Sequence, residues 1–162
     1  MRRHGLVLLL AISLAACGFQ LRGASPLPAV MERTYIQADA HSPLYFELEQ
    51  SIQAAGAQVV QSASEASATL QIHRADFSRR DRGIDQLGRV NEYEHRLQLI
   101  YSLHDSQGAS LVSHQQLQLI REQRFNPNYV LASGEEQSIL YQEMRRQAVS
   151  QLLRRLQSLA QP

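Results

Sequence analysis

The chain has 162 residues, a length that suits one domain and leaves little room for a second independent core. Apolar residues make up 44% and charged residues 19%, a balance that excludes a disordered chain and a protein with many membrane spans. The formal net charge of +1 argues against a nucleic-acid partner. The single cysteine excludes a disulfide framework within the chain and a multi-thiolate zinc site.

The N-terminus has the pattern of a bacterial lipoprotein signal. A short positive segment, Met1–His4, precedes eleven apolar or small residues from Leu6 to Ala16, too few to cross a bilayer core of about 30 Å. The run ends in Leu-Ala-Ala-Cys, which resembles a lipobox, so we expect cleavage after residue 16 and lipidation of Cys17. An ordinary signal peptide followed by a buried cysteine is the alternative.

Lipidation would make Cys17 a membrane anchor and would exclude redox chemistry at its thiol. The expected modification is a covalent diacylglycerol and an N-acyl chain, which together give stable residence in a membrane. No other cofactor and no metal are expected. Gly18 instead of Asp follows the cysteine, and by resemblance to the lipoprotein sorting pattern this favours the outer membrane of a Gram-negative envelope.

Three segments are expected along the chain. Residues 1–16 form the signal peptide, residues 17–31 a lipidated tether with two Pro and two Gly, and residues 32–162 a single domain. Loss of the signal removes two arginines, so that 14 basic residues remain against 15 acidic residues.

The first part of the domain predicts a strand and a helix. Residues 33–38 have strand character in Thr, Tyr and Ile. Ser42 as N-cap and Pro43 at the first helical position predict a helix that Gly56 ends. Residues 57–61 suit either a short strand or a loop.

The middle of the domain predicts an antiparallel meander. From Ala68 apolar and polar residues alternate, and a polar, arginine-rich stretch then covers residues 78–89. A turn at residues 105–108 separates the next two strands, the second of which covers residues 111–125 with Leu117 and Leu119 on one face. The first of these two strands has the clearest pattern, because one face is apolar or aromatic over six alternate positions: Tyr93, His95, Leu97, Leu99, Tyr101 and Leu103.

A long helix is expected to close the chain, from about residue 135 to 159. Ser133 and Glu136 have the spacing of a capping box, and the acidic residues come early and the arginines late, as the helix dipole favours. Its apolar stripe comprises Leu140, Met144, Ala148, Leu152 and Leu156. The order β-α-β-β-β-α predicts an α+β two-layer sandwich with two helices packed on one face of a four-stranded mixed sheet.

Several segments carry a resemblance to a known family. Cys17–Arg22 reads Cys-Gly-Phe-Gln-Leu-Arg, similar to the lipidated start of the lipopolysaccharide-assembly lipoprotein family LptE, also called RlpB. The resemblance continues in Glu92-Tyr93 after Gly88, in Phe125-Asn126-Pro127, and in the closing helix at Glu136-Gln137, Glu143-Met144, Ala148, Gln151-Leu152 and Arg155-Leu156. It covers nearly the whole chain after the signal.

The resemblance implies a role that the periodicity alone does not show. Members of the LptE family sit as a plug inside the β-barrel protein LptD, assist its assembly, bind lipopolysaccharide and help to insert it into the outer leaflet. The implied partners are thus an LptD-like barrel, lipopolysaccharide and the outer membrane, and the implied location faces the periplasm and the barrel lumen. The family fold, two helices on a four-stranded sheet, agrees with the predicted one.

The meander topology predicts that several arginines gather near one pole, opposite the anchor. Arginine binds phosphate in bidentate fashion, so these residues are candidate contacts to lipopolysaccharide phosphates. Arg89 is the first candidate because it adjoins Gly88 before the matched Glu92-Tyr93 segment. The others are Arg79, Arg80, Arg82, Arg121 and Arg124, with Arg74 in the same predicted group.

Two alternatives stay open for these polar surfaces. The predicted pole also holds six carboxylates against its seven arginines, which favours a solvated hairpin with mixed charges over a phosphate site: Asp76, Asp81, Asp85, Glu122, Glu135 and Glu136. The polar sheet face either meets water or lines the polar interior of a barrel, which the resemblance favours: Glu92, Glu94, Arg96, Gln98, Gln116 and Gln118.

No catalytic constellation is visible, so an enzyme is not expected. The six histidines form no metal-binding motif and are best explained as sheet histidines with satisfied hydrogen bonds. No serine lies in a nucleophile-elbow motif. The alternative to the barrel plug is a free outer-membrane lipoprotein that binds a small anionic ligand or peptidoglycan, and a periplasmic hydrolase ranks last.

Overall fold

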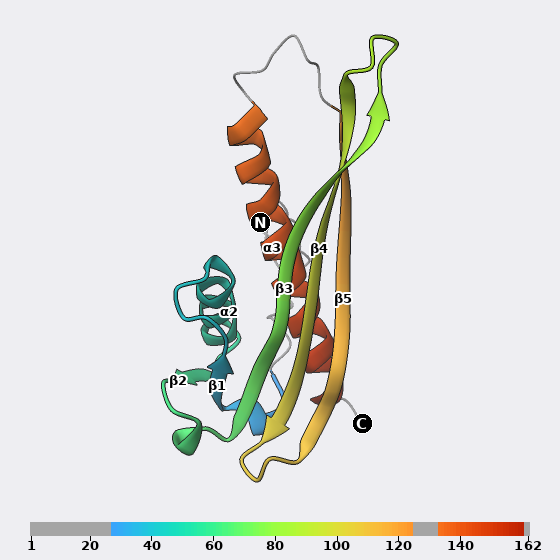
Figure 1. The fold of residues 1–162 in the computed structure, drawn as a ribbon. Coiled ribbons are helices and arrows are strands. Elements are labelled where there is room, and N and C mark those ends of the chain that lie inside the picture. The colour runs from blue at the N-terminus through green and yellow to red at the C-terminus, as the bar shows by residue number, and fades with distance from the viewer. Residues whose placement is uncertain (1–26, 125–132, 161–162) are drawn as a thin grey trace, which may run out of the picture.

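A mixed five-stranded sheet with two helices on one face forms the domain (Figure 1). The computed structural model describes residues 27–124 and 133–160, without the side chains of Ser133 and Ala160. The elements in chain order are η1 (Ala29–Met31), β1 (Arg33–Gln37), α2 (Pro43–Ala54), β2 (Gln58–Val60), η2 (Ala63–Glu65), β3 (Ala68–Ile84), β4 (Val90–Asp105), β5 (Ser110–Arg124), α3 (Ser133–Gln157) and η4 (Ser158–Ala160).

The sheet order is β2-β1-β3-β4-β5, with β1 parallel to both neighbours and β3, β4 and β5 antiparallel. This arrangement confirms the predicted α+β sandwich, with one more strand than expected. The extra strand is β2, three residues long, which pairs Gln58–Val60 with Arg33–Tyr35. The sequence left this segment open between strand and loop, and pairing with β1 settles it as an edge strand.

The β3 strand is much longer than the alternating segment that predicted it. Its 17 residues continue through the first half of the arginine-rich stretch, because β4 supplies a pairing partner up to Val90. On the other edge of β3, strand β1 pairs only with the first four residues, Ala68–Gln71. In Figure 1 the β3–β4 hairpin therefore extends past the start of α3 as a projecting arm.

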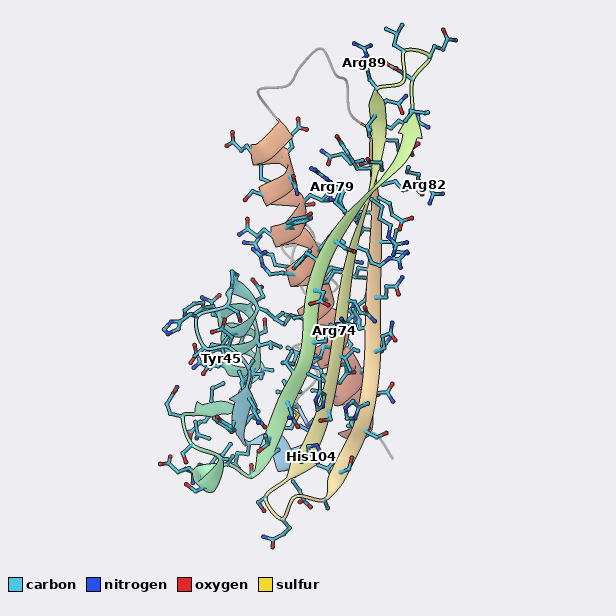
Figure 2. All side chains as sticks on the ribbon, in the orientation of Figure 1. Tyr45, Arg74, Arg79, Arg82, Arg89 and His104 are labelled. Atoms are coloured by element: carbon cyan, nitrogen blue, oxygen red, sulfur yellow. The ribbon has the colours of Figure 1, made fainter. Side chains whose placement is uncertain are left out.

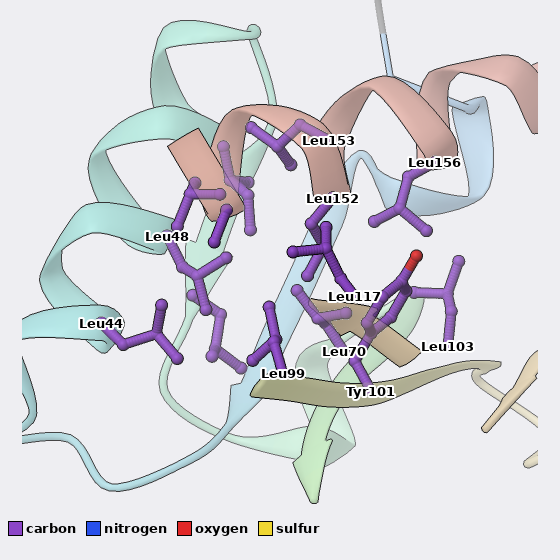
Figure 3. Close-up of a cluster of buried hydrophobic side chains, with 14 of the residues drawn as sticks. Leu44, Leu48, Leu70, Leu99, Tyr101, Leu103, Leu117, Leu152, Leu153 and Leu156 are labelled. Atoms are coloured by element: carbon purple, nitrogen blue, oxygen red, sulfur yellow. The ribbon is translucent and has the colours of Figure 1, made fainter. Parts of the chain in front are cut away.

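One apolar core joins both helices to the sheet (Figure 3). The predicted stripe of α3 is confirmed at Met144, Ala148, Leu152 and Leu156, all at most 1% exposed. The apolar face of β4 is confirmed as well, since Leu97, Leu99, Tyr101 and Leu103 are equally buried. Full burial of each such side chain contributes about 1.5–3 kcal/mol, so these elements fix the two-layer arrangement.

Local signals in the sequence set the bounds of α2. The Ser42 hydroxyl accepts a hydrogen bond from the Tyr45 N–H at 3.2 Å, and Pro43 opens the helix, as predicted. Gly56 adopts a φ of 90° just after the helix, a conformation that residues with a Cβ rarely take. Leu48 and Ile52 on its inner face are fully buried.

The domain begins before residue 32. Leu27 and Met31, which fall in the expected tether, pack into the core at 8% and 0% exposure. The buried Thr34 hydroxyl donates to the Met31 carbonyl at 2.7 Å and ties η1 to β1. The signal peptide, Cys17, the Phe125-Asn126-Pro127 segment and the Ser133 side chain of the expected capping box lie outside the described residues.

Candidate functional site

The half of the β3–β4–β5 meander next to the hairpin tip at residues 85–89, called the upper half below, carries most of the arginines that the sequence singled out. Pairing sets Arg79 and Arg121 on either side of His95, and Arg80 beside Glu94. In Figure 2 Arg79 lies toward α3, whereas Arg82 lies on the opposite side of the sheet and Arg89 at the tip. The expected cluster is therefore divided between two faces and a turn.

On the helix-covered face, arginines join the sheet to α3. Arg79 Nη1 donates to Gln137 Oε1 at 3.2 Å, and its guanidinium lies 4.6 Å from the centre of the Tyr93 ring. Arg121 donates in the same way to Gln147. Hydrogen bonds to these amides thus fix the orientation of both side chains beside α3. Because the amides are neutral, the positive charge of each arginine stays uncompensated.

On the open face, which is the side of the sheet that neither helix covers, arginines are paired with carboxylates. Arg82 contacts Glu94 at 2.8 Å and Glu122 at 3.3 Å, and Arg96 contacts Glu94 at 2.9 Å. The hydrogen bond from Arg96, followed by that from Arg82, holds the pKa of Glu94 below its usual range. This alternating charge ladder is already neutralised internally, which makes Arg82 a weaker candidate for an external phosphate.

Arg89 has a structural role in the tip of the hairpin. Asp85 Oδ1 accepts the backbone N–H groups of Leu87 and Arg89, both at 2.9 Å, and Asp85 Oδ2 accepts Arg89 Nε at 2.8 Å. The backbone hydrogen bond from Arg89 contributes most to lowering the pKa of Asp85. Gly88 completes the turn at a φ of 75°. The tip is therefore a closed turn that displays Leu87 with 76% exposure.

The remaining arginines differ in their partners. Arg74 lies mid-strand, away from the tip, and pairs with Asp76, so the structure does not bring it to the predicted pole. Arg80 and Arg124 have no carboxylate within 4.0 Å among the residues that the structure describes. These two exposed guanidinium groups are the freest cations of the predicted set, a ranking that spacing along the chain could not give.

A buried polar network below the arginines was not foreseen. His95, 1% exposed, has its Nε2 at 2.9 Å from Gln123 Oε1, and its ring packs edge-on to Tyr141. Burial, reinforced by the nearby charge of Arg79, lowers the pKa of His95 although Gln123 opposes the shift. Gln137 donates to the Tyr141 hydroxyl at 2.9 Å. The His95–Tyr141 ring contact and the Arg79–Gln137 hydrogen bond join this network across the interface between the sheet and α3.

Three histidines gather on the open face near the lower end. Ser102, 1% exposed, has its hydroxyl 2.9 Å from His73 Nε2 and 3.0 Å from His104 Nε2, and His114 stacks on His73 with ring centres 4.0 Å apart. Register shifts in β3 and in β5 flank Ser102, so bulges bring the rings together. Burial, then His114 and His104, lowers the pKa of His73.

Comparison with known families assigns the chain. A family model described as "LptE: Lipopolysaccharide-assembly" matches residues 30–156. The chain belongs to the LptE family. Proteins named LPS-assembly lipoprotein LptE from Pectobacterium atrosepticum and Yersinia pestis are 30% identical to it over 163 and 165 residues, which cover 96% of this chain and 85% and 77% of those relatives.

Solved structures of similar fold agree with the LptE assignment. The solution structure of an uncharacterized lipoprotein B from Nitrosomonas europaea matches with a TM-score of 0.74 at 36% identity, covering 87% of this chain and 91% of that one. The crystal structure of the rare lipoprotein B from Shewanella oneidensis matches with a TM-score of 0.68 at 19% identity, covering 78% and 94%, and supports the fold alone.

The described residues contain neither a membrane-spanning helix nor a metal-binding cluster. Within residues 27–124 and 133–160, no helix is long and apolar enough to cross a membrane. Nor does that part of the chain group three or more His, Cys, Asp or Glu side chains so that they could hold a metal ion.

Proposed function

We propose that this protein is an outer-membrane lipoprotein, anchored through acyl chains on Cys17, that plugs an LptD-like β-barrel and helps to insert lipopolysaccharide into the outer leaflet. Membership of the lipopolysaccharide-assembly family supports the pathway. The lipobox-like sequence before Cys17 supports the anchor. The proposed role is structural and ligand-binding, not catalytic.

The open face of the sheet carries the barrel part of the proposal. Both helices pack on the other face, which leaves the long β3–β4–β5 meander uncovered over Arg82, Glu94 and Arg96. Glutamines continue this face at Gln98 and Gln118, which pair across β4 and β5. The interior of an outer-membrane barrel is polar, so a polar sheet face suits its wall.

For lipopolysaccharide, the candidates are the cations of the upper half. Arg80 and Arg124 can offer both guanidinium nitrogens to a phosphate, and Arg121 and Arg79 keep their charge while bound to amides. Arg82 and Arg89 must first leave Glu94 and Asp85. This order of preference replaces the one drawn from the sequence, in which Arg89 came first.

Photocrosslinking in intact cells tests the face that meets the barrel. A photoreactive phenylalanine analogue at Gln98 or Gln118 should join the lipoprotein to one large heat-modifiable outer-membrane protein. The same analogue at Gln142, a glutamine exposed on α3, serves as the matched position on the other side of the molecule. Equal crosslinking from both sides would contradict the open face as the specific contact, and recovery of uncrosslinked lipoprotein alone would favour a free lipoprotein instead.

A further inference from the structure

The outer edge of β5 is a long strand edge with which no described strand pairs. β5 comes last in the sheet order and pairs only with β4, and in Figure 1 it is the outermost strand on the side away from α2. Charged side chains, proline and bulges usually protect such edges. Residues 115–120 have none of the three, because both register shifts lie before Gln115 and the first charge is Arg121.

One backbone group of this edge already binds a donor from outside the sheet. The Gln116 carbonyl accepts a hydrogen bond from Arg155 Nη1 at 3.1 Å, in an exposed position. Since β4 occupies the other side of the strand, this carbonyl points to the outer edge. The backbone groups of successive residues point alternately to the two sides of a strand, so those of Gln118 and Ile120 point outward as well. The edge therefore offers N–H and C=O groups of alternate residues to a further strand.

A pocket of about 380 Å³ adjoins the same edge on the helix-covered face. It lies between the start of β5 and the end of α3, where Leu111 and Leu159 are 41% and 49% exposed and Val112 is partly buried. The side chains of an extended segment added to β5 would alternate between this pocket and the open face. Apolar side chains suit the pocket, because they remove Leu111 and Leu159 from solvent, and polar side chains suit the other side, beside Gln118.

The pocket beside the edge decides between a second copy of this chain and a segment of another protein. If two β5 edges paired, the second copy would bring Leu117 and Leu119 to the helix-covered side. Both side chains are already buried in their own core, at 1% and 7% exposure, so a second copy has no free apolar side chains to place in the pocket. A segment that belongs to no sheet keeps its apolar side chains free. The edge and the pocket together therefore fit such a segment.

We propose that the outer edge of β5 binds, by strand addition, an extended segment of a partner protein in which apolar and polar residues alternate. The outward N–H and C=O groups of Gln116, Gln118 and Ile120 supply the main-chain hydrogen bonds, and the pocket at Leu111 receives the apolar side chains. An N–H of the bound segment replaces Arg155 at the Gln116 carbonyl. The site uses neither the arginines of the upper half nor the charge ladder, so its test does not depend on the proposed barrel.

Hydrogen exchange of the full lipoprotein in a nonionic detergent tests the edge directly. The probe is a synthetic peptide in which Val and Thr alternate, and a peptide of the same composition with all Val before all Thr is the control. We expect the alternating peptide to protect the backbone N–H groups of Gln116, Gln118 and Ile120 saturably, and the control to protect them little. Protection absent from β5, or equal with both peptides, would overturn the proposal. Protection that rises with protein concentration without any peptide would assign the edge to a second copy and overturn it as well.

Two pairs of variants separate the backbone edge from the pocket. Gln118→Pro removes one outward N–H without touching the hydrogen bonds to β4, and should weaken peptide binding at least about tenfold. Gln118→Ala keeps that N–H and should bind the peptide like the wild type. Leu159→Glu places a charge in the pocket and should weaken binding, whereas Ser158→Glu, at the adjacent exposed position outside the pocket, should not. Unchanged binding in Leu159→Glu contradicts the site even if Gln118→Pro fails to fold.

Discussion

Arginine side chains of the upper half differ more in their partners than in their positions. Arg82 and Arg89 lie next to carboxylates at 2.8 Å, whereas Arg80 and Arg124 are without a described counterion. A guanidinium engaged with a carboxylate must give up that contact before it binds a phosphate, so proximity to the tip alone does not rank the candidates. The sequence placed these residues in one half of the molecule but could not assign them to faces, because the faces depend on strand register and on the bulge near Arg82.

Charge reversal should expose this ranking. Arg80→Glu and Arg124→Glu should each weaken lipopolysaccharide binding about tenfold, the effect of losing one charge-assisted contact. Arg89→Ala should act less on binding and more on the order of the tip, since Arg89 holds Asp85. Binding of labelled lipopolysaccharide to the purified variants measures this, with Arg154→Glu near the end of α3 as control. A larger loss in Arg89→Ala than in the other two would contradict it.

Protonation of His95 should make stability depend on pH. Burial lowers its pKa in the folded protein, so the unfolded chain, with an ordinary pKa of about 6.5, binds the proton more tightly. The stabilisation by neutral His95 is therefore present above about pH 6.5 and is lost as the pH falls below it. His73 is shifted in the same direction and should add to the slope.

The measurement is the free energy of unfolding by urea between about pH 7.5 and about pH 5. His95→Gln should flatten this dependence, even if the variant is less stable throughout. His41→Gln, at an exposed position, should keep the wild-type slope. An unchanged slope in His95→Gln would show that His95 is not the titrating group.

At the scale of elements, alternation and capping predicted well those helices and strands whose formation depends only on their own residues. The apolar face of β4, the stripe of α3 and the start of α2 all follow from local spacing. The three residues of β2 and the upper part of β3 do not, because pairing with β1 and β4 makes them strands. Likewise, the histidine group around Ser102 depends on two bulges that no periodicity reveals.

The apolar face of β4 should be sensitive to loss of volume. Leu99 is fully buried between the two helices and the neighbouring strands, so Leu99→Ala should lower the free energy of unfolding by about 2–5 kcal/mol. Leu87→Ala at the tip, where the side chain is 76% exposed, should change it by less than about 0.5 kcal/mol. Urea unfolding of both variants checks the difference, and similar losses would contradict the described core.

The N-cap of α2 offers a smaller and sharper test. Ser42→Ala removes the hydrogen bond to the Tyr45 N–H and should cost about 1 kcal/mol of unfolding free energy. Ser42→Asn supplies another capping oxygen and should restore most of it. If both variants lose the same amount, the cap does not stabilise the helix.

The whole molecule is a sheet with two different faces. One face is closed by α2 and α3 over a single apolar core, and the other presents a charge ladder, glutamines and histidines. The membership of the LptE family gives this asymmetry a biological setting in lipopolysaccharide assembly. The closed face stabilises the fold, and we propose that the open face meets a barrel.

Purification of a C-terminally tagged protein from envelopes in mild detergent tests that account most directly. We predict that it brings down one much larger, heat-modifiable β-barrel protein in stoichiometric amount. Charge reversal across the open face, with Glu94→Arg and Arg96→Glu combined, should reduce the recovered barrel without unfolding the lipoprotein. Recovery of the wild-type lipoprotein alone, folded and without a barrel, would contradict the plug and indicate a free outer-membrane lipoprotein.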